Sequence, residues 1–122
     1  MTKERPVISG LINEGTSEIE LFQNKTLRTI IKMQHVLLID SFKHYLQKRK
    51  IDFVVLSEQK KRSRISSVFK TDNNYKNINL GFIIGHFSKD EFDFYTINSS
   101  EINRRILQII AQRIRDSITE IL

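Results

Sequence analysis

The sequence contains no cysteine, no tryptophan, one proline and only four glycines among its 122 residues. The lack of cysteine excludes disulfide scaffolds, thiolate metal sites and cysteine nucleophiles. The scarcity of proline and glycine argues against collagen-like, linker-rich or turn-dense β architectures, because their turns need a fixed or a positive φ.

Long apolar runs are also missing. No stretch approaches the roughly 18 residues that a membrane-spanning helix needs. The first ten residues, MTKERPVISG, lack the apolar stretch that is typical of a signal peptide. We therefore expect a soluble, cytoplasmic protein with no membrane partner.

The residues that are present suffice for one hydrophobic core. Apolar residues make up 39% of the chain, charged residues 28%, and the formal net charge is +6. This length and apolar share fit a single domain. Pro6, Gly10 and Gly15 interrupt any regular pattern near the start. Residues 1–25 are therefore predicted to be a flexible or loosely docked segment, and residues 26–122 a helical domain.

Apolar residues recur at helical spacing in the two longest segments of this domain. One face of residues 26–50 carries Leu27, Ile31, Leu38 and Phe42, and residues 101–122 carry a stripe of isoleucines. Each pattern predicts a long amphipathic helix.

Capping residues mark shorter helices between these two segments. Ser57 predicts a helix over 58–70, and Asp72 or Asn73 one over about 74–86. The pattern Ser88-x-x-Glu91 is a capping box that predicts a short helix after it. Residues 51–56 are interpreted as a buried linker. The sequence thus predicts an all-α, single-domain, irregular bundle of four to five helices.

No pattern of catalytic residues stands out. The hydrolase elbow, the dinucleotide fingerprint and the P-loop are all absent. His35 and His44 are nine residues apart on one predicted helix, so they point to opposite sides and cannot share a metal. Asp40 and His44 could form one ligand pair, but a surface ion pair is the simpler interpretation. His86 is interpreted as a residue that stabilises a helix C-terminus. We therefore predict no catalytic or metal-binding residues and no cofactor.

Positive charge concentrates in residues 26–70, which hold 11 basic and 3 acidic residues. Several of these cations lie near a predicted helix N-terminus, where they oppose the dipole, so helix stability does not explain them. A basic face at residues 43–70 could bind phosphates with steep salt dependence; the alternative is a merely solvated surface. The candidate anion-binding residues are Lys48, Arg49, Lys50, Lys60, Lys61, Arg62 and Arg64.

A second candidate site lies in the more apolar part of the chain. Gly81 and Gly85 form a G-x-x-x-G pattern, which would let another helix approach closely, within the domain or between subunits. Phe92 and Phe94 lie on different faces of the short predicted helix, so one of them could be left for a subunit interface.

Three runs resemble a known family: Asn24–Lys32 followed by Gln34 and His35, Leu80–Phe87, and Asn98–Arg105. Together they resemble a small family of uncharacterised, all-helical bacterial proteins that are often labelled glyoxalase. The resemblance covers about residues 20–122 and implies a helical protein. Glyoxalase-type enzymes are βαβββ modules with histidine and glutamate ligands on strands, and this sequence has neither those strands nor that ligand set.

Three functional hypotheses follow. The first is a non-catalytic interaction or self-association module, with a second copy or another protein as its partner. The second is a binder of nucleic acid or another polyanion through the basic face. The third and most remote is a metal-dependent glyoxalase-type lyase, as the family label suggests.

Overall fold

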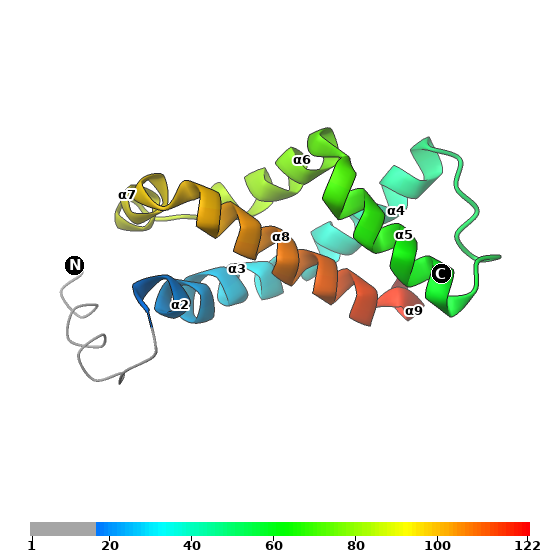
Figure 1. The fold of residues 1–122 in the computed structure, drawn as a ribbon, viewed down its shortest axis with the longest axis horizontal. Coiled ribbons are helices and arrows are strands. Elements are labelled where there is room, and N and C mark those ends of the chain that lie inside the picture. Colours follow the sequence, from blue (N-terminus) through cyan, green and yellow to red (C-terminus); the bar gives the residue numbers. More distant parts are fainter. Residues whose placement is uncertain (1–16) are drawn as a thin grey trace.

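The computed structural model describes residues 17–122, and within this range it contains helices and no strands (Figure 1). The predicted all-α class is therefore confirmed. The elements in chain order are α2 (Glu18–Phe22), the π-helix η1 (Gln23–Leu27), α3 (Arg28–Met33), α4 (His35–Lys48), α5 (Glu58–Thr71), α6 (Asn73–Ile84), α7 (Lys89–Ile97), α8 (Ser99–Asp116) and α9 (Ile118–Ile121).

Helix α8 is the central element of the bundle. It packs against η1, α3, α4, α5, α6 and α7, and it runs in orange across the molecule in Figure 1. Ile102, Ile106, Ile110 and Ile114 recur at four-residue spacing on this helix and are fully buried. Burial of each such side chain contributes about 1.5–3 kcal/mol to folding, so this stripe anchors the core.

Aromatic side chains form two clusters in the bundle. In the first, Phe22 packs on Phe87 and Phe94 with ring centroids 5.5 and 4.9 Å apart. In the second, Phe42 and Phe69 pack on Tyr75 at 6.2 and 5.4 Å. Both the separations and the tilted or edge-on geometries are those that aromatic pairs favour.

The helical part of the chain begins earlier than the predicted boundary between residues 25 and 26. Ser17 and Glu20 form a reciprocal capping box, and the helical run continues from Glu18 through η1 into α3. Phe22 is only 3% exposed. Residues 17–25 therefore belong to the packed bundle, while the rest of the predicted N-terminal segment, residues 1–16, lies outside the described residues.

The long helix predicted over 26–50 is divided at Gln34, which ends α3 and begins α4. The prediction of one uninterrupted helix is therefore wrong. The break could not be predicted, because no proline or glycine marks it in the sequence. The last predicted helix is likewise divided at Ser117 into α8 and α9. These breaks explain why the structure has more helices than the four to five predicted.

The predicted caps of the middle helices are confirmed. The side chain of Ser57 accepts a hydrogen bond from the backbone of Lys60, and Asp72 accepts one from Tyr75. Ser88 and Glu91 form the predicted capping box. The linker over 51–56 is less buried than predicted: Phe53 enters the core, whereas Val54 and Val55 remain exposed.

Candidate anion-binding grooves beside helix α8

Helix α8 presents a polar face opposite its isoleucine stripe. Arg104, Gln108 and Gln112 recur at four-residue spacing and are exposed. This spacing places them in one row along the helix, since residues four apart share a face. The helix that anchors the core therefore also displays a row of guanidinium and amide groups to solvent.

A groove with a volume of about 690 Å³ runs between α8 and α5. No carboxylate lines it, and its four cations come from three different helices. Its charged and polar lining residues are Lys70, Lys76, Arg104, Arg115, Ser66, Ser100, Gln108 and Gln112. The electrostatic potential in this groove is therefore favourable to an anion.

Several donors in this groove are already held in place by neighbours. Arg115 donates to Ser66 Oγ at 3.1 Å and to Gln112 Oε1 at 2.8 Å. Arg104 pairs with Glu101, which also accepts from Arg105 at 2.6 Å. These hydrogen bonds lower the pKa of the Glu101 carboxyl to about 2, so Glu101 stays ionised. Within residues 17–122, Lys70 and Lys76 form no ion pair with a carboxylate.

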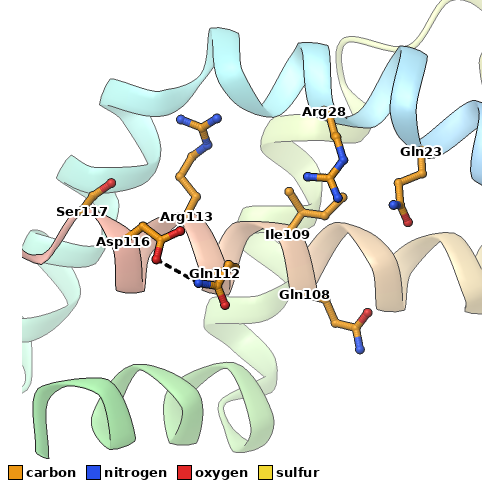
Figure 2. Close-up of a pocket in the computed structure, with 8 residues that line it drawn as sticks. All are labelled: Gln23, Arg28, Gln108, Ile109, Gln112, Arg113, Asp116 and Ser117. Carbon is orange, nitrogen blue, oxygen red and sulfur yellow. Dashed lines mark hydrogen bonds between the residues drawn. The ribbon is translucent and has the colours of Figure 1, made fainter. Parts of the chain in front are cut away.

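A second groove, with a volume of about 430 Å³, lies on the other side of α8, toward η1 and α3 (Figure 2). Figure 2 shows Arg28 reaching toward Ile109 on α8, while Arg113 reaches from α8 toward the opposite helices. Asp116 lines this groove and accepts a hydrogen bond from Gln112 at 2.9 Å. Arg28 and Arg113 thus give the second groove two cations against one carboxylate.

His35 orients Arg113 from α4. The Arg113 guanidinium lies 3.1 Å from His35 Nδ1, and His35 Nε2 lies 2.8 Å from a carboxylate oxygen of Glu120. A guanidinium can only donate, so Nδ1 accepts and the proton is assigned to Nε2, which donates to Glu120. This chain of contacts assigns His35 a positioning role and needs no metal.

The two grooves share Gln108 and Gln112, so α8 forms a ridge between them. Together they are lined by six cations and one carboxylate, with serines and glutamines between the charges. These side-chain types are the ones that contact phosphate oxygens and sugars in nucleic-acid complexes. The arrangement is suited to holding an extended anion rather than a single ion.

The seven predicted anion-binding residues do not line one common groove. Lys48 and Arg49 line a different groove, between α4 and α6, and Arg49 pairs with Asp72 at 2.7 Å. Lys61 is only 9% exposed. Lys50, Lys60 and Arg64 are exposed but line none of these grooves.

Arg62 is the one predicted residue close to the α5–α8 groove. It pairs with Glu58 at 3.3 Å and lines a shallow groove on the outer face of α5. That shallow groove shares Ser66 and Lys70 with the α5–α8 groove, so the basic surface continues along α5.

The residues of the second predicted site, Gly81, Gly85, Phe92 and Phe94, do not form one common surface. Among the described residues, an added Cβ at Gly81 would meet no atom within 4 Å, and one at Gly85 would approach the Gly81 carbonyl at 3.1 Å. The prediction of close internal helix packing at these glycines is therefore wrong. Phe94 packs on Phe22, whereas Phe92 is 43% exposed and is the one left toward solvent.

Sequence reasoning missed most residues of the two grooves, because they come from five separate elements. The available signal was the polar face of the last predicted helix, where Arg104, Gln108 and Arg115 recur opposite the isoleucines. Lys76 carried no signal, since it is an isolated cation in the sequence. Arg28 belongs to the basic segment 26–70 but lies outside the basic face predicted at residues 43–70.

The described residues offer few other sites. Among residues 17–122 there is no group of three or more His, Asp or Glu that could hold a metal ion. No helix in the same range is long and apolar enough to cross a bilayer.

Comparisons with protein-family models, with curated proteins and with solved structures give no match. The family resemblance therefore stays a prediction.

Proposed function

We propose that this protein is a binding module for a polyanion, and specifically for the phosphate backbone of a nucleic acid, through the two grooves beside α8. The observation that carries the proposal is the lining of these grooves by six cations and one carboxylate, on both sides of an exposed row of arginine and glutamine. The site replaces the basic face at residues 43–70 as the candidate surface.

The physical chemistry of phosphate contacts sets the expected behaviour. Each phosphate neutralised by a lysine or arginine releases counterions, so the affinity falls steeply with salt. Contacts to phosphates position a protein but carry no sequence information. We therefore expect binding that depends strongly on salt and weakly on sequence.

The test is fluorescence anisotropy with labelled, random-sequence single- and double-stranded DNA and RNA over a series of salt concentrations. The groove variant Lys70→Gln with Arg115→Gln removes two cations. The matched control Lys48→Gln with Lys60→Gln removes two exposed cations that line neither of the two grooves beside α8. Thermal melts of both variants establish that the fold is intact.

For a duplex, loss of two phosphate contacts should lower the slope of log K against log salt by about 1.8 in the groove variant. The control variant should keep nearly the wild-type slope. Equal loss in both variants would mean that total charge, and not the grooves, drives binding. No binding by the wild type at low salt would reject the proposal.

A second candidate function, self-association, is favoured by a separate apolar surface. Met33 and Val36, beside the break at Gln34, are 67% and 70% exposed. The Gln34 side chain lies 3.0 Å from His86, which brings this surface next to the exposed Gly85. Aromatic and methionine side chains are enriched at subunit interfaces, and exposed apolar clusters commonly mark them.

Sedimentation velocity over a concentration series tests self-association. Replacement of Met33 and Val36 by lysine should shift a dimer to monomer, and Val54→Lys with Val55→Lys is the matched control on another exposed apolar pair. A wild-type protein that sediments as a monomer at all concentrations would exclude this candidate.

A further inference from the structure

A third groove, with a volume of about 470 Å³, lies between α4 and α6 and is separate from the grooves beside α8. The two helices run antiparallel: Arg49 near the end of α4 binds Asp72 at the start of α6, and Gln34 before α4 contacts His86 after α6. The volume lies within the range of small-molecule pockets.

One end of this groove is apolar and open. Leu37, Ile78 and Phe82 line it, and Leu37 and Ile78 are 47% and 48% exposed. Burial of such surface is favourable at about 25 cal/mol per Å². This end therefore provides a site for an acyl or aryl group.

The other end of the groove carries a cation. Lys48 lies on the same face of α4 as Leu37, about 16 Å along the helix axis at about 1.5 Å per residue. The carboxylate of Asp72 forms an ion pair with Arg49 and accepts a hydrogen bond from the Tyr45 hydroxyl at 3.0 Å. Within the described residues Lys48 has no carboxylate partner, so it can bind an anionic group of a ligand.

Acceptors lie between the two ends. Asp40 and Ser41 line the wall of the groove, and Ser41 lies beside the hydroxyl of Tyr75. Asn79 also lies beside that hydroxyl, although within the described residues neither the hydroxyl nor Asn79 Oδ1 makes a hydrogen bond of normal geometry.

We propose that this groove binds an amphipathic carboxylate with a hydrogen-bond donor between its ends, the chemistry of an N-acyl amino acid. The acyl chain lies on Leu37, Ile78 and Phe82, the amide N–H donates to Asp40 or Ser41, and the carboxylate binds Lys48. The order of these groups along α4 matches the order of groups along the ligand.

The test is titration of the protein with N-octanoylglycine, followed by calorimetry and by amide chemical shifts. Two matched probes isolate the ends: the methyl ester of N-octanoylglycine lacks the negative charge, and N-acetylglycine lacks the apolar chain. The variants are Lys48→Gln and Ile78→Gln, with Lys50→Gln as a control, because Lys50 is exposed near the same helix end but lies outside the groove.

We expect N-octanoylglycine to bind and both matched probes to bind at least about tenfold more weakly. The ester loses a charge-assisted hydrogen bond and N-acetylglycine loses the burial of the apolar chain, and each of these contributes at least about that factor. Lys48→Gln and Ile78→Gln should weaken binding by a similar factor, and Lys50→Gln should not. Equal binding of acid and ester, shifts confined to other helices, or no binding of N-octanoylglycine at millimolar concentration would each overturn the proposal.

Discussion

At the scale of single residues, Asp72 connects three parts of the bundle. Its carboxylate caps α6 through the backbone of Tyr75, accepts from the Tyr45 hydroxyl and pairs with Arg49. These interactions hold the pKa of Asp72 below its usual range, the backbone hydrogen bond foremost. A lowered pKa in the folded state means that the ionised carboxylate stabilises the fold.

Replacement of Asp72 by alanine should lower the free energy of unfolding at pH 7 by about 2 kcal/mol, because a cap contributes about 1 and the other contacts add to it. Asp72→Asn retains a capping oxygen and should lose less. The stability from this carboxylate is present above its unfolded pKa and is lost as the pH falls through the folded pKa. The free energy of unfolding, measured by urea denaturation between pH 7 and pH 2, should therefore decrease less with falling pH in Asp72→Asn than in the wild type.

Tyr75 offers a second prediction at this scale. Its ring packs in the aromatic core, and burial raises its pKa above the usual range. Its hydroxyl lies beside Ser41 and Asn79 but makes no hydrogen bond of normal geometry within the described residues. Tyr75→Phe should increase the free energy of unfolding by about 1 kcal/mol, because it removes an unsatisfied buried group and keeps the ring. A loss of stability in chemical denaturation would show that the hydroxyl is hydrogen-bonded in solution.

At the scale of elements, α6 carries a glycine in its interior that no packing contact requires. An added Cβ at Gly81 meets nothing within 4 Å. Gly81→Ala should therefore raise the free energy of unfolding by up to about 1 kcal/mol through helix propensity. Gly85→Ala should gain less, since its Cβ would lie 3.1 Å from the Gly81 carbonyl. Thermal melts of the two variants compare these gains in stability. A loss of stability in Gly81→Ala would indicate that another chain packs against Gly81.

The middle helices show which local signals are sufficient for prediction. Ser57, Asp72 and Ser88 begin their helices as predicted, because a cap acts within one turn of its own sequence. The break at Gln34 and the π-helix after Phe22 were not predicted. No proline or glycine marks either one, so the neighbouring helices decide where the regular hydrogen bonding changes.

At the scale of the whole molecule, Phe22 joins the first helical turns to α7 and the loop before it, at the same end of the bundle (Figure 1). It contacts Phe87 and Phe94, although these residues are more than 60 positions away in the sequence. Phe22→Ala should lower the free energy of unfolding by about 3–5 kcal/mol, and the matched variant Phe92→Ala by less than about 1 kcal/mol, because Phe92 is 43% exposed. Equal losses in equilibrium denaturation would contradict the docking of α2 on the bundle.

The sequence by itself determined the helical class, the approximate bounds of the capped helices and the isoleucine stripe of α8. All of these depend on spacing within a few residues, where periodicity and capping act. Only the tertiary structure decided which cations share a groove. Lys70, Lys76, Arg104 and Arg115 meet because α5, α6 and α8 pack together. Lys48 and Arg49 instead line a different groove, where Arg49 pairs with Asp72, and Lys61 is buried. The physical reason is that the electrostatic potential at a site sums charges from every nearby helix. The packing of the helices decides which charges are nearby, and a short run of sequence does not specify that packing.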